Sequence, residues 1–299
     1  MPTKFWGYRK MEFSGKTRVC GVIGDPIEHT LSPLIHNAAF RSLKLDFVFV
    51  AFRVRKADLG NAINSVRSLG IHGLNVTMPH KNAVIKYLNE IDSAAKFLRS
   101  VNTIRNDNGK LLGFNTDGVG ALKALQENGA DLKNRKLLLL GAGGAAKAIA
   151  FYAAKEAKEL VILNRSPEKA ESFAKVLRGR FGKKIVGGSL SPNLMKENLQ
   201  DSDILINATS VGMSPKTNES LVSRQWLKPN LYVMDIVYSP LETRLARDAK
   251  EMGAKVISGV EMLIYQGAAS FEIWTGRSAP VEVMKKAVLN RLSEEGDMA

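Results

Sequence analysis

Residues 137–148 read Leu-Leu-Leu-Leu-Gly-Ala-Gly-Gly-Ala-Ala-Lys-Ala, and this stretch decides the fold. The leucines form a continuous apolar run of the kind found in central strands of parallel sheets. Glycines allow unusual backbone dihedrals and a close approach to a pyrophosphate, and the N–H groups that open the next helix bind anions. Strand, glycine turn and helix therefore predict a Rossmann-type dinucleotide site at Gly141, Ala142, Gly143, Gly144 and Ala145. A purely structural strand–helix turn is the alternative.

The end of the next expected strand, Leu163-Asn164-Arg165-Ser166, indicates which dinucleotide binds. An NAD site usually has an acidic residue about 20 positions after the glycines, bound to the ribose 2′-hydroxyl. Asn164 stands near that position and is not acidic. Arg165 can lie against the adenine and bind a 2′-phosphate, with Ser166 and Lys169 as further donors. We expect NADP; the alternative is that Arg165 and Lys169 are ordinary solvated charges.

Strand-like and helix-like segments alternate along almost the whole chain, which predicts an α/β fold with parallel sheets. Expected strands are 18–23, 47–52, 72–76, 101–105, 110–114, 135–140, 160–163, 204–207, 232–236 and 255–257. Expected helices are 32–42, 56–68, 81–88, 91–98, 117–128, one through 155, 167–177, 241–252 and the chain after 259. Asn-Asp-Asn-Gly at 106–109 predicts a hairpin. Boundaries near 116–118 and 259 divide the chain into 1–116 with 260–299, and 117–259.

The charge balance favours an anionic small molecule as partner. The 299 residues include 43 Lys and Arg against 29 Asp and Glu, a net charge of +14. These basic residues are scattered, so we do not expect a nucleic-acid interface. The glycines and Lys147 interrupt the longest apolar stretch, 137–154, so we expect no membrane span. Residues 1–13 lack the apolar core of a secretory signal, which points to the cytoplasm; Met11 is an alternative start.

Cysteine and histidine are too sparse for a metal site. Cys20 is the single cysteine, which excludes a disulfide framework within one chain, and its apolar neighbours predict a core position. The four His, at 29, 36, 72 and 80, do not have zinc-like spacing. We expect no catalytic metal.

Two polar motifs suggest the chemistry. Residues 72–81 read His-Gly-Leu-Asn-Val-Thr-Met-Pro-His-Lys, and residues 113–118 read Gly-Phe-Asn-Thr-Asp-Gly. Each places one ionisable side chain, Lys81 or Asp117, among small hydrogen-bonding residues at the end of a predicted strand. A cation and an anion held in this way can grip a polyhydroxylated substrate and move a proton. A surface ion pair with an Asx-type helix cap at Asp117 is the alternative.

A third motif, Gly-Asp-Pro-Ile-Glu-His-Thr-Leu-Ser-Pro-Leu-Ile-His-Asn at 24–37, offers an anion site. Thr30 and Ser32 stand just before a helix that has Pro33 in its first turn. Two hydroxyls together with the N–H groups of that helix can hold a carboxylate. The alternative is that Ser32 simply caps the helix.

The chain resembles the shikimate dehydrogenase family from Val19 to about Leu289. The motifs that carry the resemblance occur in order at 24–33, 75–81, 100–103, 113–118, 141–145, 164–166, 207–212, 235–240 and 259–268. Among them are Asn-Val-Thr-Met-Pro-His-Lys, Ser-Val-Asn-Thr and Gly-Val-Glu-Met-Leu-Ile-Tyr-Gln-Gly-Ala. So many ordered motifs are highly specific.

The resemblance implies a reversible reduction of 3-dehydroshikimate to shikimate with NADPH, a step toward the aromatic amino acids. It implies that Lys81 and Asp117 are catalytic, and that an N-terminal α/β substrate domain receives the C-terminal helices and adjoins the Rossmann domain across a hinged cleft. Implied substrate residues are Thr30, Ser32, Asn75, Thr77, Asn102, Tyr238 and Gln266. Further expected cofactor residues are Asn207, Thr209, Gly259 and Met262, with turn chemistry and core packing as the alternatives for Asn207, Thr209 and Met262. We expect a monomer or homodimer.

Departures from the family pattern keep other functions open. Thr30 stands where the family commonly has Ser. Its extra methyl group crowds the carboxylate site, so a dual quinate/shikimate dehydrogenase is an alternative function. Ser166 replaces the commoner Thr, a minor change. A non-catalytic dinucleotide-binding regulator on the same fold is the other alternative, although a regulator need not retain Lys81 and Asp117.

Overall fold

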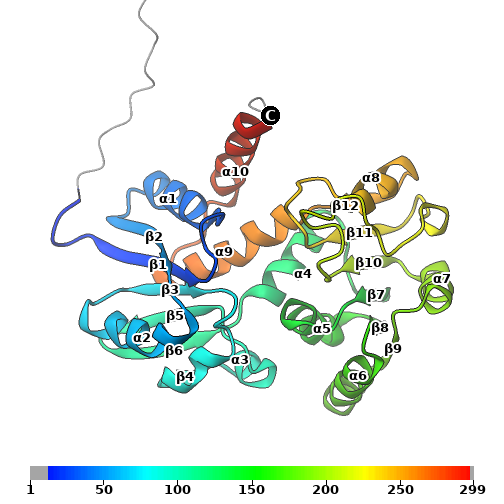
Figure 1. Ribbon diagram of the computed structural model, residues 1–299, viewed down its shortest axis with the longest axis horizontal. Helices are drawn as coiled ribbons and strands as arrows, with labels where there is room; N and C mark the ends of the chain where they lie inside the picture. The colour runs from blue at the N-terminus through cyan, green and yellow to red at the C-terminus, as the bar shows by residue number, and fades with distance from the viewer. Residues whose placement is uncertain (1–12, 297–299) are drawn as a thin grey trace, which may run out of the picture.

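The computed structural model describes residues 13–296 as two six-stranded sheets that lie side by side, each with its own helices (Figure 1). The expectations about a secretory signal and an alternative start at Met11 concern residues outside this range. An α/β architecture is confirmed. No helix in the described range is long and apolar enough to cross a bilayer. No group of three or more His, Cys, Asp or Glu within it could hold a metal ion.

The first sheet is mixed rather than purely parallel. Its order is β2 (Phe47–Arg53), β1 (Arg18–Gly24), β3 (Gly73–Val76), β5 (Thr103–Asp107), β6 (Lys110–Phe114) and β4 (Glu90–Ile91). β1 runs parallel to β2 and β3, whereas β5 is antiparallel to both β3 and β6. The predicted hairpin at 106–109 explains the antiparallel pairing of β5 with β6, because Asn108 and Gly109 both adopt the positive φ that a tight hairpin turn needs.

Helices cover this sheet much as expected. They are α1 (Ser32–Ser42), the short 3₁₀ helix η1 (Lys56–Asp58) leading into α2 (Leu59–Ser68), the 3₁₀ helix η2 (Ala83–Tyr87) and α3 (Ser93–Leu98). The helix predicted at 81–88 is only a 3₁₀ turn. The segment expected as helix 91–98 begins as strand β4. One core forms under α1 around Phe40 and Phe49, and another under α2 around Ile63 and Ile104.

The second sheet is parallel throughout and has the doubly wound order. Its strands are β12 (Lys255–Ile257), β11 (Tyr232–Asp235), β10 (Ile204–Asn207), β7 (Lys136–Leu140), β8 (Glu159–Asn164) and β9 (Lys184–Ser189). Its helices are α5 (Gly144–Glu156), α6 (Pro167–Phe181), α7 (Pro192–Asp201) and α8 (Arg244–Glu251), with the 3₁₀ turn η3 (Arg224–Trp226). The strand order reverses between β7 and β10, and ligands bind at the carboxyl ends of strands at such a switch point. β9 and α7 were not predicted.

Two helices join the halves, α4 (Asp117–Glu127) and α9 (Gly259–Thr275), and both lie between the sheets in Figure 1. A Cβ added to Gly118 would overlap the backbone oxygen of Ala148 in α5, and one added to Gly120 would lie 2.5 Å from the backbone nitrogen of Gln266 in α9. α4 therefore packs at backbone distance against both neighbours. The last helix, α10 (Val281–Gly296), packs on α1.

Candidate active site

Lys81 and Asp117 meet at the carboxyl end of β3. Nζ of Lys81 lies 2.7 Å from Oδ2 of Asp117, and the two side chains are 24% and 8% exposed. The loop that carries Lys81 is fixed on both sides of it: His80 Nε2 lies 2.7 Å from the Val54 carbonyl oxygen, and the Lys81 carbonyl accepts from the Val101 N–H at 2.8 Å. His80 is thus an anchor for the loop. The pair is largely enclosed, unlike an ordinary surface ion pair.

Several groups fix the position of the Asp117 side chain. Its Oδ1 accepts from Nδ2 of Asn102 at 2.7 Å, in addition to the ammonium on Oδ2. It is the first residue of α4, where the helix dipole favours a negative charge. Asn115, not Asp117, makes the Asx-type turn, because its Oδ1 accepts from the Asp117 N–H at 3.1 Å. Both carboxylate oxygens therefore serve the site.

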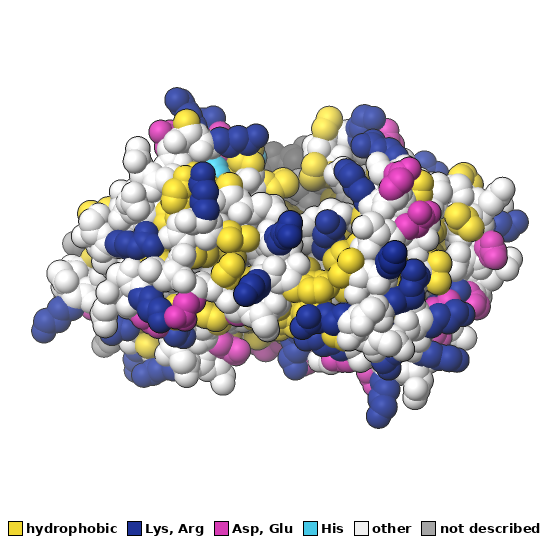
Figure 2. All heavy atoms as spheres, turned by 90° about the horizontal axis from the view of Figure 1, so that it is seen from below, with side chains coloured by type: hydrophobic (Ala, Val, Ile, Leu, Met, Phe, Trp, Pro, Cys, Tyr) yellow, Lys and Arg dark blue, Asp and Glu magenta, His cyan; other side chains and the backbone are white. Residues whose placement is uncertain are grey.

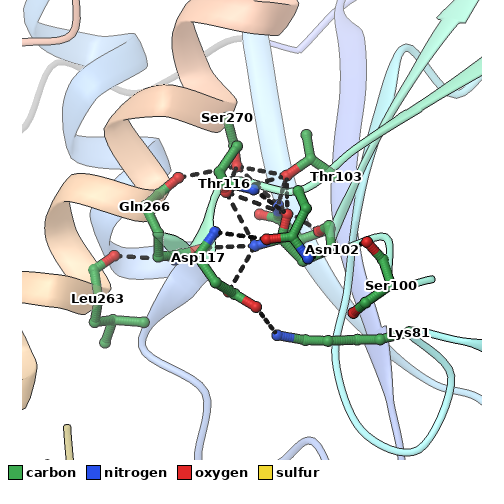
Figure 3. A network of polar contacts seen from close by, with 11 residues as sticks. Lys81, Ser100, Asn102, Thr103, Thr116, Asp117, Leu263, Gln266 and Ser270 are labelled. Carbon is green, nitrogen blue, oxygen red and sulfur yellow. Dashed lines mark hydrogen bonds and ion pairs between the residues drawn. The ribbon is translucent and has the colours of Figure 1, made fainter. Parts of the chain in front are cut away.

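Asn102 is the centre of a buried network behind the ion pair (Figure 3). Its Oδ1 accepts from the Thr116 N–H and from the Thr103 hydroxyl, each at 2.9 Å. Its Nδ2 also donates toward Thr116 Oγ1 at 3.0 Å. These bonds leave the Asn102 amide a single orientation, with its nitrogen toward Asp117.

Asn75 and Gln266 join the same network from β3 and α9. Nδ2 of Asn75 donates to the Asn102 carbonyl at 3.1 Å, to Thr103 Oγ1 at 3.2 Å and to Ser270 Oγ at 3.1 Å. Oε1 of Gln266 lies 3.4 Å from Nδ2 of Asn102. α9 therefore brings Gln266 and Ser270 into a site otherwise built from the first half of the chain, as Figure 3 shows.

Thr30 and Ser32 bond to each other beside this site rather than capping α1. The Thr30 hydroxyl donates to Ser32 Oγ at 3.2 Å and accepts from the Ser32 N–H at 3.3 Å. The N-cap residue of α1 is Leu31, and no side chain caps the helix, so the simple capping role of Ser32 is wrong. Their loop begins beside the segment that leads to Lys81, because the Asp25 N–H donates to the Met78 carbonyl oxygen at 3.1 Å.

Tyr238 stands apart from the other predicted substrate residues. It follows β11, is 40% exposed and makes no hydrogen bond with any residue from 13 to 296. The structure thus joins Lys81, Asp117, Asn75, Asn102 and Gln266 by direct contacts but does not connect Tyr238 to them.

The glycine turn after β7 has the form that a pyrophosphate requires. Gly141 has φ +112°, and a Cβ there would lie 2.8 Å from the Ala208 carbonyl oxygen. α5 begins with Gly143 as N-cap and without a side-chain cap, so its first N–H groups are free for an anion. A Cβ on Gly143 or Gly144 would meet open space, so the approach to these N–H groups is clear.

Two neighbouring residues at the end of β8, Asn164 and Arg165, have different surroundings. Asn164 Oδ1 accepts from the Ala142 N–H at 3.2 Å, and its Nδ2 donates to the Ser166 carbonyl at 3.0 Å, so Asn164 braces the glycine turn. Arg165 is exposed and pairs with no group in the described part of the chain. Lys169 is also exposed, one turn into α6.

The expected cofactor residues after β10 and β11 make local contacts. Oδ1 of Asn207 accepts from the Thr209 N–H and hydroxyl at 3.1 and 2.7 Å, and its Nδ2 donates to Asp235 at 3.0 Å. Burial raises the pKa of Asp235, which receives this bond and one from Thr243. Met262 packs in the core of the second sheet.

Gly259 is required at the start of α9. A Cβ there would lie 2.5 Å from the carbonyl oxygen of Ile236 and 2.7 Å from that of Val237. The helix that brings Gln266 and Ser270 to the site thus begins in close contact with the loop after β11.

Three family models match the chain in order. The model described as shikimate dehydrogenase substrate binding domain matches residues 22–104, shikimate / quinate 5-dehydrogenase matches 123–239, and shikimate 5′-dehydrogenase C-terminal domain matches 259–289. Together they cover α9 and most strands of both sheets, and β6 and β12 lie in the gaps between the matched ranges.

Relatives match over nearly their full length. The chain is 53% identical over 279 residues to a protein of Pyrococcus abyssi and 45% identical over 282 residues to one of Methanocaldococcus jannaschii, both named shikimate dehydrogenase (NADP(+)). These alignments cover 93% and 94% of this chain and 99% of each relative. A crystal structure of a shikimate dehydrogenase in complex with NADP+ is 43% identical, with a TM-score of 0.88, covering 96% of this chain and 99% of that one.

Proposed function

This chain belongs to the shikimate dehydrogenase family, and from that premise we propose that it reduces 3-dehydroshikimate reversibly to shikimate with NADPH. The observation that carries the chemistry is the enclosed Lys81–Asp117 pair, with 2.7 Å between Nζ and Oδ2. It supplies a positive charge and a proton where a ketone would become an alcohol.

Lys81 acts as the acid in the reducing direction. Its ammonium has three protons, one of which is directed at Asp117, so the others can face a substrate oxygen. As the ketone oxygen gains negative charge, the ammonium stabilises that charge and transfers a proton to the oxygen. Bound NADPH supplies the hydride to the carbonyl carbon. In the reverse direction Lys81 accepts the proton of the alcohol.

Asp117 orients Lys81 and accepts from a substrate hydroxyl. The network through Asn102, Thr103 and Thr116 keeps the carboxylate in place, so no reorganisation is needed when substrate binds. We assign Asn75, Asn102, Gln266, Thr77 and Tyr238 to substrate hydroxyls, and Thr30 and Ser32 to the carboxylate. In support, most of these side chains meet in one network or beside it, although Tyr238 would have to join it when substrate binds.

The glycine turn fits NADP. Free N–H groups at the start of α5 suit the pyrophosphate. The guanidinium of Arg165, which has no partner among residues 13–296, suits a 2′-phosphate, with Ser166 and Lys169 nearby. We assign the cofactor to residues Gly141 through Ala145, with Asn164, Asn207 and Gly259 supporting the turns around it and Thr209 and Met262 beside it. The substrate half is then 1–116 with 260–299, and the nucleotide half is 117–259.

An assay with two alcohols and two cofactors tests this function. Purified protein should reduce NADP+ with shikimate, and should use NAD+ or quinate much less well. Comparable rates with quinate and shikimate would support the alternative of a dual quinate/shikimate dehydrogenase, which Thr30 suggested. Binding of NADP+ without any turnover of either alcohol would support a regulator instead.

We also propose that the protein works in the cytoplasm as a monomer or homodimer. Every assigned residue comes from one chain, so a monomer has a complete site. Its one cysteine, Cys20, is buried and unpaired, as is usual in a reducing compartment. Light scattering coupled to size exclusion would give the oligomeric state, and cell fractionation would give the location.

A further inference from the structure

Two buried polar atoms below the candidate substrate site have no partner. They are Nδ1 of His36 in α1 and Oδ1 of Asn75 in β3, and neither bonds to any described residue. The side chains that carry them belong to residues that are 1% and 6% exposed. Leaving a buried polar atom unpaired is costly, so such atoms generally mark a bond or a ligand that the resting contacts do not show.

A flip of the Asn75 amide group would not solve the missing hydrogen bond of Oδ1. Its nitrogen faces the Asn102 carbonyl oxygen, Thr103 Oγ1 and Ser270 Oγ, and its two hydrogens are fully used there. The opposite orientation would set two carbonyl oxygens against each other. Oδ1 therefore points away from the network and needs a donor from another direction.

His36 is placed to be that donor. Its Nε2 would lie 3.6 Å from a Cβ added to Gly267 of α9, and Ser270, one turn further along α9, bonds Asn75. The His36 ring stacks on Phe49 at 4.4 Å and packs against Trp274, which fixes its plane. Burial lowers the pKa of His36 to about 3, and the Asn75 side chain opposes part of this shift, as an acceptor beside a ring N–H does. The imidazole is therefore neutral and has a single N–H.

We propose that His36 is a positioning residue, whose Nδ1–H donates to Oδ1 of Asn75 and so holds the Asn75 amide in the orientation that bonds the Asn102 carbonyl and Thr103. Through Thr103 and Ser270, the same amide borders the network that holds Asn102, whose side chain we assign to the substrate. This role of His36 toward substrate rests on the proposed function of the site. His36 itself touches no reacting atom.

Two substitutions separate the donor from the packing of the ring. His36→Phe keeps an aromatic ring against Phe49 and Trp274 but removes the donor, and His36→Asn restores a donor near Nδ1 but loses the stacking. We expect His36→Phe to raise the KM for shikimate about tenfold, with little change in kcat or in the KM for NADP+. His36→Asn should recover most of this loss even if its Tm is lower.

Two controls show whether the effect passes through Asn75. In an Asn75→Ala background, His36→Phe should change the KM by less than about twofold, because the acceptor is already gone. His72→Phe removes a partly buried contact of another ring nitrogen, with the Trp274 carbonyl, and should lower Tm without affecting the KM. An unchanged KM in folded His36→Phe, or an equal loss in the Asn75→Ala background, would overturn the role.

The tautomer can be measured without any activity. Nitrogen-15 spectra of the wild-type protein, assigned by elimination with variants of His29, His72 and His80, should show His36 as the Nδ1–H tautomer with no titration above about pH 5. An Nε2–H tautomer, or titration near the ordinary value, would refute the proposal. A wild-type protein that did not oxidise shikimate would refute the proposed function alone, since the spectra would still decide the His36–Asn75 bond.

Discussion

Lys81 holds the proton that the proposed reaction moves. Removing the Lys81 side chain should therefore affect kcat more than the binding of NADP+. Lys81→Ala should lower kcat by a factor of about 10²–10⁴, the usual contribution of a positioned acid or base. NADP+ affinity should change little, because the glycine turn lies on the other sheet. Lys86, exposed in the same segment, gives the matched control as Lys86→Ala. Near-normal kcat in the Lys81 variant, measured with saturating shikimate, would make the pair structural.

Arg165 decides between the two dinucleotides if it binds the 2′-phosphate. Its guanidinium is exposed and unpaired in the described structure, so Arg165→Ala should not disturb the fold. We expect NADP+ to bind at least about tenfold more weakly, in line with the loss of a charge-assisted hydrogen bond, while NAD+ binding is preserved. Titration calorimetry with both cofactors measures this, with Lys175→Ala in α6 as control. Equal losses for both would exclude a 2′-phosphate contact.

Sequence motifs indicated the ionisable pair and Asn102 beside it, but not the hydrogen bonds that hold Asn102 in place. Lys81 and Asp117 stand out because each is a charge within a run of small polar residues. Thr103 and Ser270 are single hydroxyls in strand and helix patterns, and only the packing of α9 on the first sheet brings them together at 2.8 Å. The role of Asn115 in place of Asp117 in the turn likewise depends on backbone geometry that spacing does not reveal.

At the scale of elements, α4 packs against α5 at backbone distance. Gly118 faces α5 so closely that a methyl group would overlap a backbone oxygen, and backbone cannot move aside cheaply. Gly118→Ala should therefore lower the free energy of unfolding by about 1–3 kcal/mol. Gly179 in α6 has open space, so Gly179→Ala should raise it by about 0.5–1 kcal/mol. Urea titrations compare the two, and equal stabilisation by both would contradict the tight packing of α4.

Elements with strong patterns were predictable, and weakly patterned ones were not. β7 is an apolar run, and α1 has a proline in its first turn. The bounds of both elements agree with the expected ranges to within one residue. β9 is an edge strand that contains Gly187 and Gly188, which remove the β-branched signal. α7 buries only Met195 and Leu199, so its apolar stripe is narrow. The antiparallel pairing of β5 with β6 follows from the hairpin that the turn residues did predict.

At the scale of the whole molecule, α9 should make the two halves unfold together. Met262 and Tyr265 pack in the core of the second sheet, whereas Phe271 and Trp274 of the same helix pack in the core of the first. Loss of either core therefore exposes part of the other. We expect one calorimetric transition, and Trp274→Ala should move it to lower temperature as a single peak, at a cost of about 3–5 kcal/mol. Two resolved transitions would mean that the halves are energetically separate.

Cys20, the single cysteine, should not react with thiol-directed probes in the folded protein. It is fully enclosed in β1, and burial raises the pKa of its thiol, so the reactive thiolate is scarce. Maleimide dyes should leave the native protein unlabelled and should react once guanidinium unfolds it. New cysteines in place of exposed Lys56 in the first half and Glu171 in the second would then be the only sites modified. Energy transfer between dyes at those positions would follow the separation of the halves as NADPH and shikimate are added, without any other residue having to be removed.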